Sequence, residues 1–202
     1  MEIRITEKGF SFEKDLNHLD QFVIDFTTLL NSLGLRYTIV SGYVSILFGR
    51  SRSSEDIDLI IEQLDEESFR RLWEALLEGF ECLNSHQLGE AYSDYITKRT
   101  AIRFSRKNEF IPNMEMKFPQ NDLDRWTLDN GKEVVLNGRR FAISPLELQI
   151  PFKLHLGSPK DIEDAKHLYE LFKDRLDTGL MATFLRKLKV EKEFTRFLAH
   201  AA

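Results

Sequence analysis

The sequence predicts an α+β protein with a small mixed β-sheet flanked by helices and a helical C-terminal part. Three observations lead to this fold class. Short β-branched or alternating segments recur between residues 36 and 143. Apolar residues at three- and four-residue steps mark two helices in the first half of the chain. After residue 143, two Ser-Pro helix starts follow each other. We therefore expect a core with an N-terminal helix over residues 1–143 and a helical subdomain over residues 144–202.

The N-terminal segments can be assigned one by one from their patterns. Residues 2–6 alternate and predict a short edge strand, and Ser11 is expected to cap a helix whose apolar face extends to Leu33. Gly34 ends that helix in the position that glycine favours. Three segments follow: a strand over residues 36–40, one or two helical turns over 43–49, and a basic, hydroxyl-rich loop over 50–54.

The middle of the chain alternates between strand and helix signals. Residues 55–62 are β-branched and predict a strand, and Asp65 is expected to cap a helix whose apolar face runs from Phe69 to Phe80. The pattern of residues 82–97 is ambiguous. Further strands are expected over 100–105, over 113–118 and, as a hairpin around the favoured turn pair Asn137-Gly138, over 132–143.

The C-terminal part contains one conflict between signals. Residues 146–156 alternate strictly, as a strand does, but Ser144-Pro145-x-Glu147 forms a capping-box pattern that favours a helix. We predict a helix there, kinked at Pro151. Ser158 starts another helix, and residues 178–200 are expected to form the last one.

Composition limits the classes of function. The chain has 28 Lys and Arg against 33 Asp and Glu, and this net charge of −5 does not indicate a large nucleic-acid-binding surface. Because no apolar run is long enough for a transmembrane helix and the N-terminus lacks a signal-peptide core, we expect a cytoplasmic protein with no membrane partner. The single cysteine fits a reducing compartment. The sequence has no glycine-rich phosphate loop and no His-Glu-x-x-His metal motif.

The stretch best suited to chemistry is Asp56-Ile57-Asp58. Two residues apart on a strand, both carboxylates point to one face, roughly 6.5–7 Å apart, while Ile57 points to the other face. Carboxylates in this arrangement can hold two Mg²⁺ ions for in-line phosphoryl transfer. A second Asp-x-Asp, Asp122-Leu123-Asp124, lies in a polar stretch, and we interpret it as a solvated helix start.

The residues around this pair resemble a known family. An apolar strand, Gly42, a short helix and the run Gly49-x-x-Arg52-x-x-x-Asp56-Ile57-Asp58 are similar to the nucleotidyltransferase superfamily with the polymerase-beta-type fold. Among its branches, the small bacterial and archaeal AbiEii-like nucleotidyltransferases look most similar. The resemblance covers residues 36–62 best, 113–118 less closely and 144–172 loosely. It implies that residues 1–143 form the nucleotidyltransferase-like core. In the loosely similar part, four residues follow in the family's order: Lys153, Lys160, Asp161 and Asp164.

The resemblance also implies roles for individual residues. Asp56, Asp58 and a third carboxylate would be catalytic and would bind two Mg²⁺ ions; Glu115 fits the third position best, and Asp94 and Glu109 are the alternatives. Glu115 would also act as general base on the acceptor hydroxyl. The implied contacts to the nucleoside triphosphate are Ser41, Gly42, Ser45, Arg52 and Lys153.

Lys153 has a physical argument of its own. The distal phosphates of a triphosphate need a cation, so we expect Lys153 to face the pair of aspartates. Arg50 or Arg52 could supply that cation instead. For both Arg52 and Lys153 the alternative is an ordinary solvated side chain.

Together these residues predict a Mg²⁺-dependent nucleotidyltransferase that moves an NMP from an NTP to a hydroxyl of an unknown acceptor, which could be a transfer RNA, a protein or a small molecule. As in toxin members of the branch, an antitoxin protein is a candidate partner. The alternative is a catalytically inactive module of the same fold that binds a nucleotide or a partner. That alternative arises because Tyr43 stands where the family has Gly or Ser.

Overall fold

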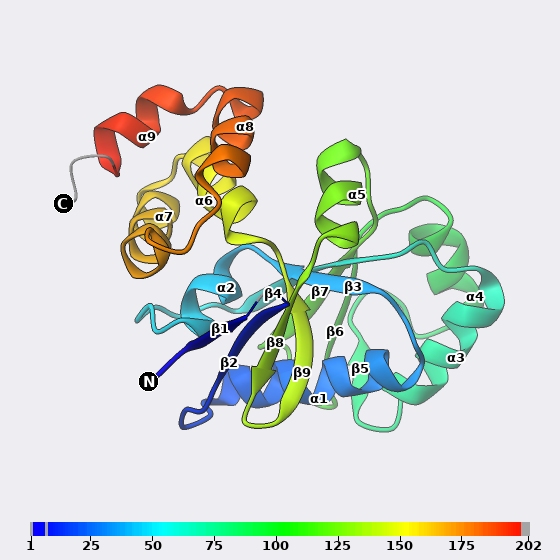
Figure 1. Ribbon diagram of the computed structural model, residues 1–202. Helices are drawn as coiled ribbons and strands as arrows, with labels where there is room; N and C mark the ends of the chain where they lie inside the picture. Colours follow the sequence, from blue (N-terminus) through cyan, green and yellow to red (C-terminus); the bar gives the residue numbers. More distant parts are fainter. Residues whose placement is uncertain (1, 7, 199–202) are drawn as a thin grey trace. The chain divides into compact units, whose positions relative to one another are not determined.

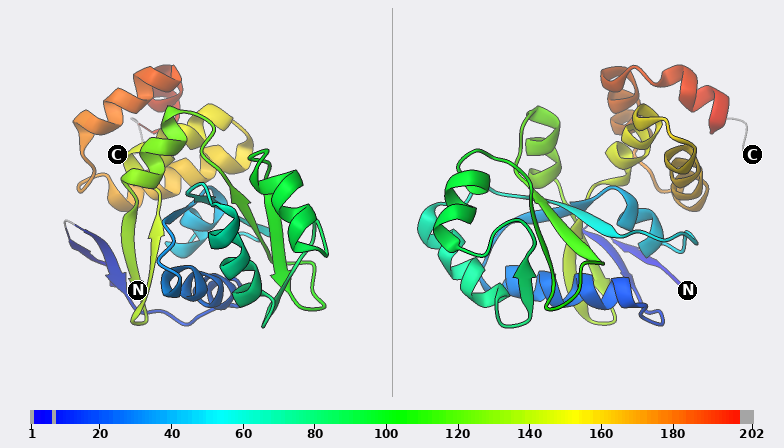
Figure 2. Two further views of the ribbon diagram at one scale, coloured as in Figure 1. Left: turned by 90° about the vertical axis from the view of Figure 1, so that its right-hand side faces the viewer. Right: turned by 180° about the vertical axis from the view of Figure 1, so that it is seen from behind.

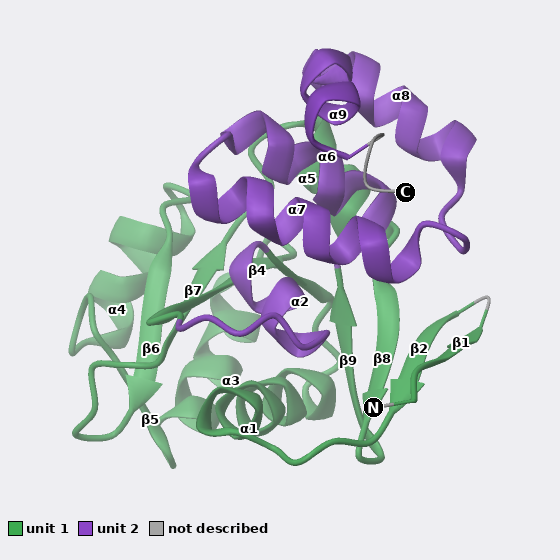
Figure 3. Ribbon diagram, turned by 90° about the vertical axis from the view of Figure 1, so that its left-hand side faces the viewer, with its two compact units in different colours: residues 1–40, 54–143 green, residues 41–53, 144–202 purple. Residues whose placement is uncertain are grey.

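The computed structural model describes residues 2–6 and 8–198. The chain forms two compact units, coloured separately in Figure 3: unit 1 comprises residues 1–40 and 54–143, and unit 2 comprises residues 41–53 and 144–202. The segment 41–53, which lies between two strands in the sequence, therefore groups with the C-terminal helices rather than with the sheet. Each unit has its own set of buried apolar side chains.

Unit 1 contains a mixed β-sheet (Figure 1), which confirms the predicted fold class. Within the described residues the strand order is β1-β2-β8-β9-β3-β4-β7-β6-β5. The pairs β2/β8, β3/β9 and β4/β7 are parallel, and the other neighbours are antiparallel. The strands are β1 (Arg4–Thr6), β2 (Gly9–Phe12), β3 (Tyr37–Val40), β4 (Asp56–Ile61), β5 (Phe80–Cys82), β6 (Ile102–Arg106), β7 (Asn113–Lys117), β8 (Lys132–Leu136) and β9 (Arg139–Ile143). The helices of this unit are α1 (His18–Ser32), α3 (Glu66–Leu76), α4 (Leu88–Ala91), a π-helix (Tyr92–Ile96) and α5 (Asp122–Asp129).

The centre of this sheet has one apolar and one polar face. Side chains alternate along a strand, so Ile57 of β4 and Phe104 of β6 share the apolar face through their register with Met114 of β7. Helices α1 and α3 cover that face, where Phe104 packs against Phe26 and Trp73 at ring-centroid distances of 6.2 and 5.9 Å. Figure 2 shows α1 and α3 next to each other on this side of the sheet. The residues between these apolar positions point to the other face, and they include the aspartates of β4.

Two sequence expectations for unit 1 are wrong. Ser11 does not cap a helix but lies in β2, and α1 begins later, after Asn17, whose side chain accepts a hydrogen bond from the Asp20 backbone at 2.8 Å. Phe80 does not belong to α3 but to β5, and its ring packs edge-on against Phe26 at 5.2 Å. In both places the chain next to the helix forms a strand that pairs with a later strand, β8 for β2 and β6 for β5, so local spacing does not reveal the boundary.

Unit 2 is helical in the residues that are described. It contains α2 (Gly42–Leu47), α6 (Leu146–Leu156), α7 (Pro159–Phe172), α8 (Thr178–Leu188) and α9 (Glu191–Phe197). The predicted helix α6 is confirmed, and its misleading alternation has a simple cause. Helices α7, α8 and α9 all contact α6, so it buries residues on several sides and its apolar positions need not follow the helical period.

The ends of two helices in unit 2 differ from expectation. Pro145 is the N-cap of α6 without a side-chain cap bond, so the capping box expected from Ser144 does not form. The single helix expected over residues 178–200 is two helices, separated by Lys189 in a left-handed conformation with φ of 59°. Residues 199 and 200 of that prediction lie outside the described residues. Nowhere in the described chain is a helix both long and apolar enough to cross a membrane.

Candidate active site

Three carboxylates share the polar face of the unit 1 sheet. Asp58 of β4 lies in register with Glu115 of the parallel strand β7, and Asp56 lies two residues earlier on the same face, beside Asn113. The side chains of Asp58 and Glu115 are 16% and 14% exposed. Adjacent strands are about 4.8 Å apart, so these two side chains are direct neighbours. The sheet therefore brings together the carboxylates that were predicted from sequence.

The two alternative third carboxylates do not lie on this face. Asp94 is in the π-helix and forms an ion pair with Lys98 at 2.6 Å. Glu109 lies in the connection between β6 and β7. Of the three candidates, Glu115 is thus the one that neighbours Asp58.

Two cations hold Asp58 and Glu115. The amine of Lys117 lies 2.6 Å from Asp58 Oδ1 and 3.0 Å from Glu115 Oε2, and Arg103 Nη2 donates to Glu115 Oε1 at 3.0 Å. Burial raises the pKa of Glu115, but the hydrogen bonds from Lys117 and Arg103 outweigh it and hold the pKa below its usual range. Burial lowers the pKa of Lys117, but its bonds to Asp58 and Glu115 outweigh that effect and raise it. Glu115 and Lys117 are therefore both charged near neutral pH.

The donor set suits Mg²⁺ by its chemistry. Asp56, Asp58 and Glu115 offer only oxygen atoms, and Mg²⁺ commonly takes one or two carboxylates together with substrate phosphates. As they stand, however, the described residues contain no group of three or more His, Cys, Asp or Glu side chains arranged to hold a metal ion. Both oxygens of Glu115 and one of Asp58 are bonded to Lys117 or Arg103. A metal ion that binds between Asp58 and Glu115 therefore competes with these cations for the carboxylate oxygens.

A buried charge cluster in unit 2 contains Lys153. Its amine lies 2.7 Å from Asp161 Oδ1 and 3.1 Å from Asp164 Oδ2, and the side chain is only 2% exposed. Asp164 is fully buried and also faces Arg52 Nη1 at 3.2 Å and Arg50 Nε at 3.6 Å. Lys153 is thus not a solvated helix lysine. Three cations surround two carboxylates, so the cluster carries a net positive charge.

Asp161 links this cluster to the start of α7. Ser158 is the N-cap of the helix, and its hydroxyl donates to Asp161 Oδ2 at 2.5 Å. Burial raises the pKa of Asp161, but the hydrogen bonds from Lys153 and Ser158 outweigh it and lower the pKa. The cap that the sequence predicts is confirmed, and it also orients a carboxylate of the cluster.

The other predicted nucleotide contacts lie at and within α2. The backbone of Ser41 bonds to the side chain of Gln149, whose Nε2 donates to Ser41 O at 2.8 Å. Ser41 has φ of 64°, a conformation that few residues other than glycine adopt, and Gly42 begins the helix. Tyr43, which departs from the family pattern, is fully buried in the core. Ser45 is also buried, and within the described residues its hydroxyl has no hydrogen-bond partner.

Several partners of these residues are not indicated by the sequence pattern. Arg103 sits in a predicted strand at a position that alternation gives to the polar face, but the sequence does not say that β6 pairs with β7. Asp164 was placed by resemblance without a partner, and its arginines lie more than 100 residues earlier. No sequence pattern indicates the role of Gln149, because its partner is a backbone oxygen, that of Ser41, far away in the sequence.

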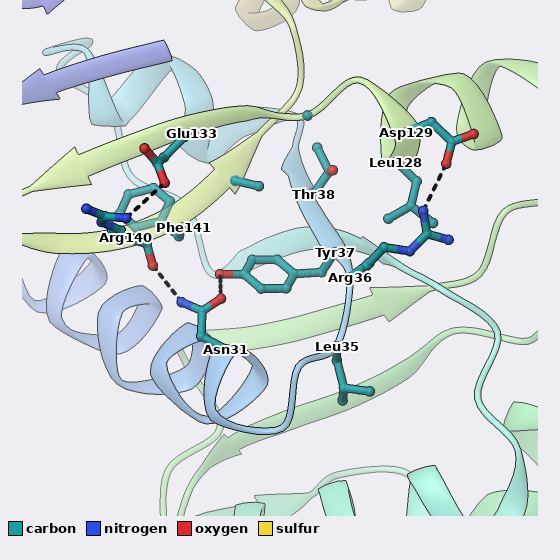
Figure 4. Close-up of a pocket in the computed structure, with 12 residues that line it drawn as sticks. Asn31, Leu35, Arg36, Tyr37, Thr38, Leu128, Asp129, Glu133, Arg140 and Phe141 are labelled. Atoms are coloured by element: carbon teal, nitrogen blue, oxygen red, sulfur yellow. Dashed lines mark hydrogen bonds and ion pairs between the residues drawn. The ribbon is translucent and has the colours of Figure 1, made fainter. Parts of the chain in front are cut away.

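A separate hollow of about 500 Å³ lies in unit 1 where β3 and β9 diverge from their single paired position (Figure 4). The Tyr37 hydroxyl donates to Asn31 Oδ1 at 3.0 Å, and Asn31 Nδ2 donates to Arg140 O at 2.7 Å. Arg36 Nη1 pairs with Asp129 at 3.2 Å. Because these polar groups satisfy one another, we assign no ligand to the hollow.

The fold is similar to those of solved nucleotidyltransferase-like proteins. The antigenic nucleotidyltransferase-like protein from Paracoccidioides brasiliensis aligns with a TM-score of 0.52 and 20% identity, over 91% of this chain and 94% of that chain. The solution structure of the antibiotic-resistance factor ANT(2'')-Ia aligns with a TM-score of 0.50 and 14% identity, over 89% of this chain and 99% of that chain. Its crystal structure in complex with adenylyl-2''-tobramycin gives a TM-score of 0.50 and 15% identity, over 83% and 97% of the two chains.

The sequence matches no protein-family model. None of the curated proteins compared with it matches either. At identities of 20% and below, the structural likeness establishes the fold and not the activity. The chain therefore has the nucleotidyltransferase fold, with a mixed sheet flanked by helices.

Proposed function

We propose that this protein is a nucleotidyltransferase that moves an NMP from an NTP to a hydroxyl group, with Mg²⁺ bound at the carboxylate face of unit 1. The observation that carries the proposal is the register of β4 and β7, which sets Asp58 beside Glu115 with Asp56 on the same face. Carboxylates arranged in this way, on a fold shared with nucleotidyltransferase-like proteins, suit phosphoryl chemistry.

The chain's own residues have distinct roles in this proposal. Asp56, Asp58 and Glu115 are the metal ligands, and the metal, when bound, supplies positive charge that offsets the phosphates. The acceptor oxygen bonds to the α-phosphorus as the bond to the bridging oxygen of the β-phosphate breaks, and pyrophosphate leaves. Glu115 accepts the proton of the acceptor hydroxyl. Lys117 bonds to Glu115 Oε2 and Arg103 to Oε1, so one of these oxygens has to be released before Glu115 can accept that proton.

Unit 2 supplies the proposed nucleotide contacts. The net positive charge of the cluster around Asp164 suits phosphate groups. Arg52 is its proposed direct phosphate partner, and the buried Lys153, which is paired with Asp161 and Asp164, would contribute through its charge. Ser41, Gly42 and Ser45 are proposed contacts at and within α2. Because Tyr43 is buried, its bulk is accounted for by packing and does not itself argue against nucleotide binding.

The acceptor is a hydroxyl of a transfer RNA, a protein or a small molecule. ANT(2'')-Ia, which shares the fold, is described with adenylyl-2''-tobramycin, which supports including small molecules in the search. A toxin role with an antitoxin partner follows from the AbiEii-like resemblance alone. In that case, expression of this protein should slow cell growth, and co-expression of the antitoxin should restore it.

The test is transfer of an α-labelled NMP. Purified protein is incubated with Mg²⁺, each labelled NTP and cell extract, and the products are separated into RNA, protein and small-molecule fractions. We expect label in one fraction, and a loss of about 100-fold or more in Asp56→Asn and Asp58→Asn, because each removes a charge at the reacting centre. The second Asp-x-Asp provides a matched control: Asp122→Asn, at the exposed start of α5, should leave transfer unchanged.

The second candidate is an inactive module that binds a nucleotide or a partner. It is favoured by the ion pairs of Lys117, which occupy Asp58 and Glu115 without a metal. Calorimetry separates the two candidates. NTP binding that is independent of Mg²⁺, with no pyrophosphate released, would support the module and contradict the enzyme.

A further inference from the structure

Lys117 occupies an unusual place among the carboxylates of β4 and β7. It lies two residues after Glu115 on β7, so both side chains rise from the same face of the strand. Its amine bridges the two strands, at 2.6 Å from Asp58 Oδ1 and 3.0 Å from Glu115 Oε2. One ammonium thus joins the two carboxylates that are proposed as metal ligands.

The bridge and a bound metal ion compete for the same oxygen atoms. A divalent cation between Asp58 and Glu115 would need the lone pairs that now accept hydrogen bonds from Lys117, and two cations in that space would repel each other. Lys117 can leave, because its four-carbon stem is flexible and its side chain is 44% exposed. Arg103 bonds to Oε1 of Glu115, the oxygen that Lys117 does not bind, so it need not move.

We propose that the Lys117 ammonium fills the cation position between Asp58 and Glu115 in the metal-free protein, and that a divalent cation enters only as Lys117 leaves. Lys117 is therefore an internal competitor that weakens metal binding and keeps the paired carboxylates stable without a metal. The inference rests on the proposed function, because it assumes that the carboxylate face binds a metal ion.

The test measures metal affinity rather than activity. The full chain is titrated with Mn²⁺, followed by electron paramagnetic resonance, and with Mg²⁺ in a calorimeter. Lys117→Met keeps most of the stem but removes the charge, and it should bind Mn²⁺ about 10-fold tighter or more, the factor that corresponds to one charged hydrogen bond. Lys98→Met removes a lysine paired with Asp94 on the surface of the same unit, and it should leave the affinity unchanged.

A second measurement needs no variant. In the wild-type protein, Lys117 is acetylated with an amine-reactive acetylating reagent and the product is quantified by mass spectrometry. Addition of Mn²⁺ should raise the acetylation rate of Lys117 severalfold and leave the rate of Lys98 unchanged. This readout remains decisive even if Lys117→Met folds poorly without a metal.

The outcomes separate the two proposals. One outcome overturns the Lys117 inference and leaves the metal site standing. In it, Asp58→Asn loses Mn²⁺ binding, Lys117→Met binds Mn²⁺ with wild-type affinity, and the acetylation rate of Lys117 does not change when Mn²⁺ is added. If neither wild type nor Lys117→Met binds Mn²⁺, or if Asp58→Asn binds it normally, both the inference and the proposed metal site are overturned.

Discussion

Lys117 and Lys153 show how burial changes the role of a lysine. The Lys117 side chain is 44% exposed, so water can solvate its amine when it leaves its partners. The Lys153 side chain is 2% exposed, and its amine is paired with Asp161 and Asp164. A buried charge without a partner is strongly destabilising, whereas a half-exposed one can exchange partners at low cost. Lys117 is therefore suited to movement and Lys153 to holding unit 2 together.

Lys153→Met should destabilise the protein by about 3–5 kcal/mol, because it leaves two buried carboxylates short of positive charge. Urea unfolding followed by circular dichroism gives the free energy of unfolding. Lys187→Met, on the exposed part of α8, should change it by less than about 0.5 kcal/mol. Equal stability of the two variants would contradict the role assigned to the cluster.

Tyr37 should resist ionisation at high pH. Burial raises the pKa of its hydroxyl from 10.0 to about 12, an effect that its hydrogen bonds to Thr27 and Asn31 reduce but do not cancel. Because the folded pKa is the higher one, the stabilising contribution is complete below pH 10 and is lost as the pH rises toward 12. Alkaline unfolding, followed by ultraviolet absorbance and circular dichroism, should therefore move to higher pH in Tyr37→Phe. Tyr95→Phe, at a half-buried tyrosine, should unfold as the wild type does.

At the scale of elements, local signals predicted those structures whose cause is local. The turn at Asn137-Gly138, the Asp65 cap and the Ser158 cap are all confirmed, because each depends on residues within three positions of each other. The boundary at Ser11 failed because β2 is stabilised by β8, more than 100 residues away. The pattern of α6 misled because its neighbouring helices, and not its own period, decide which residues are buried.

The hairpin turn between β8 and β9 gives a direct test of local strain. Gly138 has φ of +77° and open space where a Cβ would lie, so Gly138→Ala adds strain without a clash. We expect a loss of about 1–2 kcal/mol in the free energy of unfolding. Gly89→Ala in α4 also meets open space, but at an ordinary φ, and it should stabilise by about 0.5–1 kcal/mol. The two variants should shift the urea midpoint in opposite directions, and a shared direction would refute the argument.

At the scale of the whole molecule, the sequence indicated the carboxylates but not their counter-ions. Asp56 and Asp58 could be found because two residues of one strand share a face, a property of the strand alone. Glu115 was the preferred third carboxylate, but its place beside Asp58 depends on which strands pair. The bonds from Arg103 and Lys117 depend on the same pairing. The grouping of residues 41–53 with the C-terminal helices was likewise hidden, since the ion pairs of Arg50 and Arg52 reach across more than 100 residues to Asp164.

The central claim is that the carboxylate face of unit 1 transfers a nucleoside monophosphate. The most direct measurement follows two labels of one NTP, on the α- and the γ-phosphate, in the presence of Mg²⁺ and the acceptor fraction. We predict that the α-label appears on the acceptor and the γ-label in pyrophosphate in equal amounts, and that both are lost in Asp58→Asn but kept in Asp122→Asn. Appearance of the γ-label on the acceptor, or undiminished transfer in Asp58→Asn, would contradict the account.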